Sequence, residues 1–441
     1  MRGTRRRSIC AFLSAGGLLA CQGAGRLDSK GVPGAAPPFE RVFAADHLPV
    51  FELSVPDGSY RNLAADPLAY QPAHFRYRPN DDPGRAIVLP YIGLRLKGQA
   101  SFHPIDRKPA LKLKFDKYIK SQRFLGLRRL TLNNMEQDPS MVRERLSFHV
   151  YRQAGLIAPL CNSARVFVNG SYYGLYANVQ TIDRTFVETR FQPAGGNLYD
   201  ISNDGNVIDL QPASKPSFQL QTNTAVDRTS DLDALLEAVG GRSADLVDDA
   251  ASIVDLDQWL AVGAVQAVIA DWDGYFGGRN NYELYHDVGR GRFVLLPWGC
   301  DQTFGTLNGQ FKFVRYRIDG ARTENNGLLF RRCRQSPECY ERYLSQVERA
   351  LGVWEGLDLT TELNGILAQI RPSVLEDRRR SYSIEEFEQS VKDVRVFLSR
   401  RGRIVRRQLE GLRTRPDGGR LEDGAGRGAT PAGRPGRPDP P

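Results

Sequence analysis

The stretch DWDGYFGGRNNYELYHDVGRGRFVLLPWGCDQTFG, residues 271–305, places acidic and amide side chains where regular elements end. An apolar helical run ends at Asp273, and a glycine-rich turn that carries Asn280 and Asn281 follows it. A pattern typical of a β-hairpin comes next, and Asp301 stands just after it. Phosphoryl transfer uses such a set, because one Asp orients a hydroxyl nucleophile while an Asn and a second Asp hold Mg²⁺ against the phosphates.

The two halves of the chain differ in their periodicity. Alternating apolar and polar residues predict strands over 51–55, 86–96, 110–115, 127–132, 165–169, 173–179, 282–286 and 292–296. Helices are expected over 141–154, 232–239, 244–251, 256–270, 340–351, 359–370 and 384–412. This order predicts an α+β protein with two lobes: an antiparallel sheet in an N-terminal lobe of about 46–200, and a mostly helical C-terminal lobe of about 201–412.

The N-terminus has the pattern of an export signal. Three arginines precede the apolar run 9–20, which is too short to span a bilayer and closes on Leu-Leu-Ala-Cys. We therefore expect a signal peptide over 1–21 and an exported, lipid-anchored protein of the cell envelope, with Cys21 as the lipidated residue; plain cleavage is the alternative. Residues 22–45 are expected to form a flexible linker, and 413–441 a disordered Gly/Pro/Arg-rich tail.

Charge and cysteine placement exclude some classes of function. The net charge of +9 owes much to the leader and the tail, and lysines and arginines are not interleaved with aromatic residues, so nucleic-acid binding is not predicted. Cys333 and Cys339 flank a short polar loop and are expected to form a disulfide in an oxidising compartment. Cys161 and Cys300 are expected to be buried singly, and the scattered histidines argue against zinc.

Several blocks of this chain, in the right order over roughly residues 90–306, resemble the CotH family of spore-coat-protein-H-like atypical protein kinases. They are LRLKG (94–98), KPALKLKF (108–115), LNN (132–134), RERL (143–146), AG (154–155) with Pro159, VNG (168–170), YGLY (173–176), WD (272–273), NNYELY (280–285) and PWGCDQTFG (297–305). The resemblance implies a degenerate protein-kinase fold that uses ATP and a divalent metal, Mg²⁺ or Mn²⁺, to phosphorylate serine or threonine.

The resemblance also implies roles for individual residues. By position, Asp273 is expected to be the catalytic Asp, Asp301 the metal-binding Asp, and Asn280 or Asn281 the amide ligand of the metal. The lysine that contacts the nucleotide phosphates is expected to be Lys108, with Lys112 as the alternative. Glu144 is expected to pair with that lysine.

The chain departs from the family pattern at three points. Gly299 stands where the family often has an acid after Pro-Trp, and Gln180 where a Glu is common. Asn280 follows Asp273 by seven residues rather than five. These differences keep open a pseudokinase that acts as a structural or assembly protein of the envelope.

Plainer and competing readings remain beside the kinase. Asp273 could cap a helix, and Lys112 could lie on a solvated strand face. A metal-dependent hydrolase or a carbohydrate-binding protein could use the same acids, although no Gly-x-Ser-x-Gly motif occurs. The leading expectation is an exported kinase that phosphorylates Ser/Thr of an envelope or surface protein.

Overall fold

A computed structural model describes most of the chain between Ala36 and Thr414. The described residues are 36–79, 83–201, 207–226, 228–241, 246–307, 309–312, 315–320 and 325–414. The expected signal peptide, its Cys21, and most of the linker and tail lie outside them. The described residues from Phe39 onward form one compact unit.

Seven strands of the first half close into a barrel, in the order β1-β2-β3-β4-β5-β7-β6. Their bounds are β1 (Val50–Ser54), β2 (Gln71–Arg78), β3 (Ile87–Lys97), β4 (Ala110–Lys114), β5 (Arg129–Asn133), β6 (Cys161–Val168) and β7 (Ser171–Val179). The barrel closes because β1 pairs in parallel with β6, with Val50 opposite Arg165. The expectation of a simple antiparallel sheet is therefore wrong, since this pairing joins segments far apart in the sequence and has no local signal.

The alternation of β4 decides which of its side chains face the barrel core. Leu111 and Leu113 point inward and are fully buried, so Lys112 and Lys114 lie on the outer face. The interior is filled by aromatic rings in mutual contact, Phe51, Phe75, Tyr77, Phe115 and Phe124. This core holds the strands whose outer faces contribute to the site described below.

The second half combines helices with a four-stranded sheet in the order β11-β10-β8-β9. The strands are β8 (Leu198–Ile201), β9 (Phe218–Leu220), β10 (Tyr282–Asp287) and β11 (Arg292–Pro297), followed by the small pair β12 (Thr306–Leu307) and β13 (Gln310–Phe311). Helices and strands thus occur together, as the α+β expectation requires. The segment 201–228, which shows no clear pattern in the sequence, supplies the edge strand β9.

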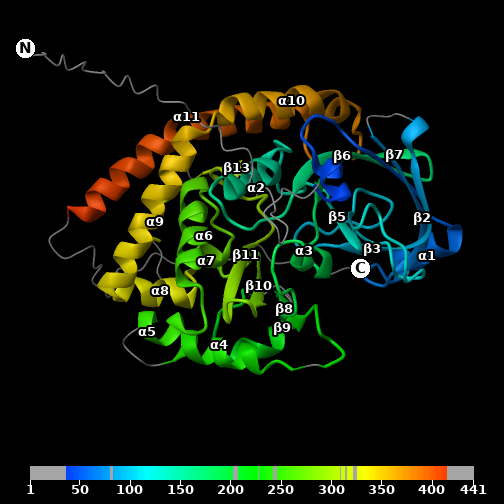
Figure 1. Ribbon diagram of the computed structural model, residues 1–441. Coiled ribbons are helices and arrows are strands. Elements are labelled where there is room, and N and C mark those ends of the chain that lie inside the picture. The colour runs from blue at the N-terminus through cyan, green and yellow to red at the C-terminus, as the bar shows by residue number, and fades with distance from the viewer. Residues whose placement is uncertain are drawn as a thin grey trace, which may run out of the picture. The chain divides into compact units, whose positions relative to one another are not determined.

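Helices surround the second sheet and cover one side of the barrel (Figure 1). They are α1 (Asp57–Ala65), α2 (Arg143–Gln153), α3 (Arg184–Glu188), α4 (Ser230–Gly240), α5 (Leu246–Ala251), α6 (Leu256–Ile269), α7 (Tyr275–Gly278), α8 (Leu328–Gln335), α9 (Pro337–Gly356), α10 (Leu359–Glu376) and α11 (Ile384–Arg413). α6 is buried nearly all round and packs against α9, whereas α10 packs on β7 of the barrel. No helix within the described residues is both long and apolar enough to cross a bilayer.

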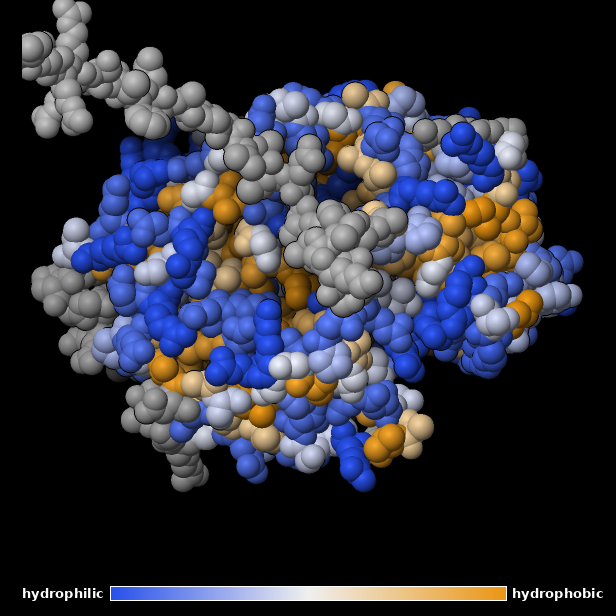
Figure 2. Space-filling model, in the orientation of Figure 1, coloured by the Kyte–Doolittle hydropathy of each residue, from blue (hydrophilic) through white to orange (hydrophobic). Residues whose placement is uncertain are grey.

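The cysteines and the surface complete the architecture. Cys333 and Cys339 form a disulfide between the end of α8 and the start of α9, with Cα atoms 5.0 Å apart. Cys161 and Cys300 are buried and free. On the face shown in Figure 2 most side chains are hydrophilic, and hydrophobic ones come to the surface over the barrel at the right and in the hollow between the barrel and the helical half.

Candidate active site

The end of α6 delivers two acids into the middle of the molecule. Ala270 takes a left-handed backbone conformation, with φ of 55°, and closes the helix directly before Asp271. Asp271 is buried, and its Oδ2 accepts a hydrogen bond of 3.3 Å from the Tyr151 hydroxyl. Gly277 lies in the following turn, where an added Cβ would come within 2.6 Å of the Trp272 carbonyl oxygen. Glycine is therefore required for this turn to fold back on the acids.

Asp273 is held by two neighbouring amides. Asn280 donates to its Oδ1 at 3.1 Å, and Asn281 donates to its Oδ2 at 2.8 Å. Burial raises the pKa of Asp273 to about 6, although these amides and Gln302 act in the opposite direction. Both asparagines thus donate hydrogen bonds to Asp273 in this structure, whereas from the sequence we expect one of them to bind the metal. Near neutral pH the carboxylate is ionised and oriented.

One face of α2 contacts both acidic segments. Glu144, Ser147 and Tyr151 follow at helical spacing, so their side chains project in the same direction. The Ser147 hydroxyl lies 2.9 Å from that of Thr303, two residues beyond Asp301. Since Tyr151 reaches Asp271, this helix fixes the acid that follows β11 relative to the acids that follow α6.

Lys97, at the end of β3, is the lysine that the structure brings to these acids. Its ammonium donates to Asn133 Oδ1 at 2.6 Å, and the Asn133 amide donates to both oxygens of Glu144 at 2.8 and 2.9 Å. Burial lowers the pKa of Lys97 to about 8, and the Lys112 ammonium adds to the effect, while Glu144 and Asp301 oppose it. Lys97 also lies over the Trp298 ring, 5.8 Å from its centre.

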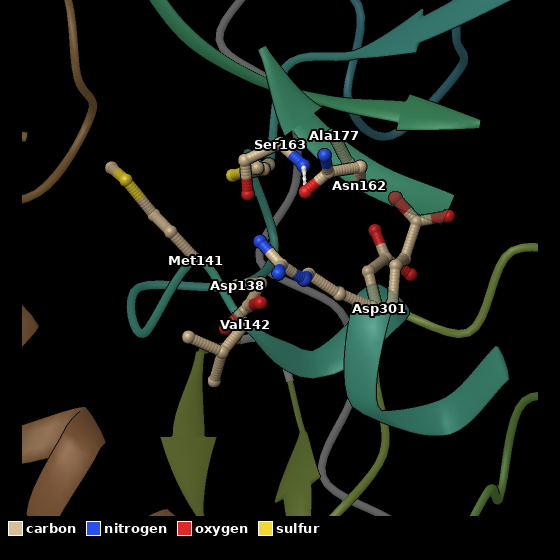
Figure 3. A pocket seen from close by; sticks show the side chains of 10 residues that line it. Asp138, Met141, Val142, Asn162, Ser163, Ala177 and Asp301 are labelled. Atoms are coloured by element: carbon tan, nitrogen blue, oxygen red, sulfur yellow. Dashed lines mark hydrogen bonds between the residues drawn. The ribbon is translucent and has the colours of Figure 1, made fainter. Parts of the chain in front are cut away.

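Asp301 completes the cluster. Burial raises the pKa of Asp301 well above its usual range, and the nearby Glu144 and Asp273 carboxylates raise it further. None of the described residues donates a hydrogen bond to this carboxylate. It lines a water-sized cavity together with Asp138 and Asn162 (Figure 3). A carboxylate that lies beside other acids suits a divalent cation, which would offset the repulsion.

The donor set fits Mg²⁺ or Mn²⁺ held partly by phosphate. Within the described ranges, no group of three or more His, Cys, Asp or Glu side chains is arranged to bind a metal ion. Mg²⁺ in nucleotide sites needs fewer, because one or two carboxylates, waters and the substrate phosphates fill its coordination sphere. Asp301 can supply such a carboxylate.

A cavity of about 190 Å³ opens beside this cluster, between the outer face of the barrel and the second sheet. Its lining is mainly polar: Tyr70, Arg95, Lys112, Leu113, Arg129, Leu130, Thr181, Asp200, Gln219 and Gln221. Lys112 and Asp200 are near enough to Lys97 to influence its pKa, so the cavity and the lysine belong to one region. Lys112, the alternative nucleotide contact from the sequence, is therefore at the site.

A scan against protein-family models matches residues 94–405 to the family described as CotH kinase protein. The chain belongs to the CotH kinase family. The match covers most of the chain and every acidic and basic group described above.

Named relatives of this CotH kinase family member come from a bacterium and a fungus. The inner spore coat protein H of Bacillus subtilis strain 168 is 25% identical over 301 residues, which cover 66% of this chain and 81% of that protein. Invasin CotH3 of Rhizopus delemar is 25% identical over 271 residues, covering 56% of this chain and 44% of the invasin. The chain thus spans less than half of that fungal relative.

Among solved structures, the Helicobacter pylori proinflammatory kinase CtkA aligns over 69% of this chain and 94% of its own. The sequence identity is 8% and the TM-score 0.29. A likeness of this degree supports no statement about the fold of this CotH family member.

Lys108, the lysine expected to contact phosphate, lies elsewhere. Its ammonium is buried and pairs with Asp377 Oδ2 at 2.6 Å, at the end of α10. Asp377 also accepts a hydrogen bond from the Leu175 backbone N–H of β7. Lys108 therefore joins the barrel to the C-terminal helices, whereas Glu144 accepts hydrogen bonds from Asn133, which in turn accepts one from Lys97. The alternation of β3 could have shown this, because Lys97 shares the outer face with Arg95 and Lys112.

The buried acids make stability depend on pH. Burial raises the pKa of Asp271 to about 8, and Asp273 next to it adds to the shift. In the unfolded chain this carboxyl has its usual pKa of 3.8, so between about pH 4 and pH 8 the folded state binds more protons. Its stabilising contribution is thus present at low pH and is lost as the pH rises through about 8.

We expect an Asp271→Asn variant to gain stability relative to the wild type as the pH rises from 4 to 8. Each unit of pKa difference corresponds to about 1.4 kcal/mol, which sets the scale of the gain. Urea unfolding of both proteins at several pH values measures it. A stability difference that stays constant with pH would show that Asp271 is ionised in the folded protein.

Proposed function

We propose that this protein transfers the γ-phosphate of ATP to serine or threonine of an envelope or surface protein, with Mg²⁺ or Mn²⁺. The observation that carries the proposal is the convergence of three groups. These are Asp273 held by two amides, Asp301 without a hydrogen-bond donor among the described residues, and Lys97 fixed through Asn133 and Glu144. Each has a separate task in phosphoryl transfer.

The tasks follow from the chemistry of each group. Asp273 accepts a hydrogen bond from the acceptor hydroxyl and takes its proton as the phosphorus–oxygen bond forms. Lys97 binds phosphate oxygens, and Asn133 and Glu144 keep its ammonium in place. Asp301 would hold the divalent ion, which supplies positive charge against the phosphates. The barrel and the helical half then act as the two lobes of a kinase-like fold, with the cavity that contains Lys112 for the nucleotide.

The departure at Gly299 is compatible with this role. Gly299 has a φ of 56°, and an added Cβ would lie 2.5 Å from Asn281 Oδ1. A larger side chain would push away Asn281, which donates to both Asp273 and the Gly299 carbonyl oxygen. In this chain the glycine therefore supports the position of the catalytic Asp.

The pseudokinase alternative also has an observation in its favour. Burial and the nearby Glu144 and Asp273 carboxylates raise the pKa of Asp301 well above its usual range, which opposes the ionised form that a metal ion needs. If the nucleotide–metal complex does not bind there, the protein keeps the fold and an assembly role. The names of its relatives, an inner spore coat protein and invasins, support an envelope location in either case.

The test is incubation of the full chain with γ-labelled ATP, Mg²⁺ or Mn²⁺, and a serine-rich acceptor. Label on the protein or the acceptor that depends on metal and is absent from Asp273→Asn supports the kinase. A second measurement follows the melting temperature with nucleotide and metal. Absence of both label and melting shift would refute nucleotide chemistry, and a melting shift without label would identify a pseudokinase.

We expect a Lys97→Met variant to transfer phosphate about 100-fold more slowly and to bind nucleotide more weakly. The reason is loss of the ammonium that Asn133 and Glu144 hold at the acids. Lys120→Met is the matched control, since Lys120 is exposed and donates to a backbone carbonyl on the barrel surface. Initial rates and nucleotide titrations of the folded variants measure the effect. Equal rates in Lys97→Met and the control would move the phosphate contact elsewhere.

A further inference from the structure

A basic groove of about 380 Å³ lies along α11 and also includes one arginine of the segment between β13 and α8. It is lined by Arg315, Arg400, Ile404, Arg407 and Gln408. Four of these lie at positions i, i+4, i+7 and i+8 of α11, on one face of the helix. We call this surface the α11 groove.

The three arginines of the α11 groove are exposed and have no acidic partner among the described residues. Other arginines of the same helix do have one: Arg406 pairs with Glu355 and Arg413 with Glu348 at 3.0 Å. Exposed arginines are often merely solvated. Here three of them line one hollow whose surface is mainly apolar, so an extended ligand there could contact apolar side chains as well as several guanidinium groups.

Hydrogen bonds connect the α11 groove to the segment around Tyr316 and to the end of α6. Gln408 of the groove donates to the Tyr316 carbonyl oxygen at 3.3 Å and accepts from the Ile318 N–H at 2.9 Å. The buried Arg401 donates to the same Tyr316 oxygen at 2.8 Å and to Ala267 O at the end of α6. Arg401, which adjoins Arg400 of the groove, thus also binds the end of α6, the helix that precedes Asp271 and Asp273.

The Tyr316 side chain extends toward the turn that follows Asp273. An added Cβ at Gly277, in the turn between Asp273 and Asn280, would lie 2.7 Å from the Tyr316 hydroxyl. Arg315, the neighbour of Tyr316, lines the groove. Tyr316 thus spans from the residue that lines the groove to the turn that follows Asp273.

We propose that the α11 groove binds an acidic segment of the protein that receives the phosphate. The identity of the occupant rests on the proposed function, because the acceptor has to lie beside Asp273. Its acidic character rests on charge complementarity, since carboxylates form paired hydrogen bonds with guanidinium groups. Specificity thus comes from charges away from the serine or threonine that is modified.

The test measures binding separately from catalysis. A short fluorescein-labelled peptide of alternating serine and glutamate is titrated, without nucleotide, into the full-length protein and into Arg400→Glu/Arg407→Glu. The control is Arg61→Glu/Lys392→Glu, which makes the same change in net charge at two exposed positions outside the groove. We expect the groove variant to bind at least about tenfold more weakly, and the control to bind like the wild type.

Further arms make each outcome decisive. Arg400→Ala/Arg407→Ala tests the groove without charge reversal, and melting curves establish that all variants are folded. Equal weakening in groove and control variants, or a wild type that prefers a lysine-rich peptide, single-stranded DNA or anionic lipid vesicles, would overturn the proposal. If the acidic peptide binds in the groove but is never labelled from ATP, the groove stands and the kinase function fails.

Discussion

Replacing Asp301 with asparagine is expected to lower the rate of phosphoryl transfer by a factor on the order of 1,000 and to abolish metal-dependent stabilisation by nucleotide. Asparagine has nearly the same shape but no charge, so the cavity beside Glu144 keeps its packing while the metal loses its carboxylate. The acids nearby would then repel each other less in the free protein. The variant should therefore be at least as stable as the wild type when no metal is present.

The matched variant Asp273→Asn separates the two acids. It should transfer phosphate as slowly as Asp301→Asn, because no carboxylate takes the proton of the acceptor hydroxyl. It should keep the shift in melting temperature with nucleotide and metal, since Asp301 and Lys97 remain. Initial rates and melting curves of both variants measure these effects. If Asp273→Asn loses the shift and Asp301→Asn keeps it, the two roles are exchanged.

Replacing Asp377 with alanine is expected to destabilise the protein by about 3–5 kcal/mol. The carboxylate is fully buried and pairs with Lys108, whose ammonium would be left without its counter-charge in the interior. Two backbone N–H groups, of Leu175 and Arg379, would also lose their acceptor. The loss should appear as a lower urea midpoint with little change in the slope of the transition.

Two further variants test whether the ion pair causes this loss. Lys108→Met/Asp377→Leu replaces both charges by apolar side chains and should recover most of the stability. Glu388→Ala breaks the exposed pair with Arg371 and should cost at most about 1 kcal/mol. A double variant no more stable than Asp377→Ala would show that the lost backbone hydrogen bonds, rather than the unpaired charge, are responsible.

The order of secondary-structure elements in the stretch 271–305 could be predicted from neighbouring residues alone. Helix end, glycine turn, hairpin and acid follow one another within a few residues, and the structure has α6, α7, β10 and β11 in that order. The sequence placed Asp273 and Asn280 near each other, but the hydrogen bond between them is seen only in the structure. The partner of this stretch, α2, was predicted as a helix, but its contacts through Tyr151 and Ser147 depend on packing between distant segments.

The lysines show the limit of the sequence most clearly. Lys97, Lys108 and Lys112 lie within or next to strands of similar pattern, and only the pairing of β3 with β4 and the position of α10 separate them. Lys108 finds a counter-charge 269 residues away, which no local rule can anticipate. Asn133 and Glu144 hold Lys97 because the end of β5 and the start of α2 lie beside it in space.

The sequence by itself determined the family, the α+β composition, and the acidic and amide side chains of the segment 271–305, because these depend on residue type and on neighbours along the chain. The tertiary structure alone decided that the barrel closes through β1 and β6, that Lys97 rather than Lys108 meets the acids, and that Asp301 has no donor among the described residues. Each of these depends on segments brought together by burial of apolar surface, and burial is also what shifts the pKa values of the acids.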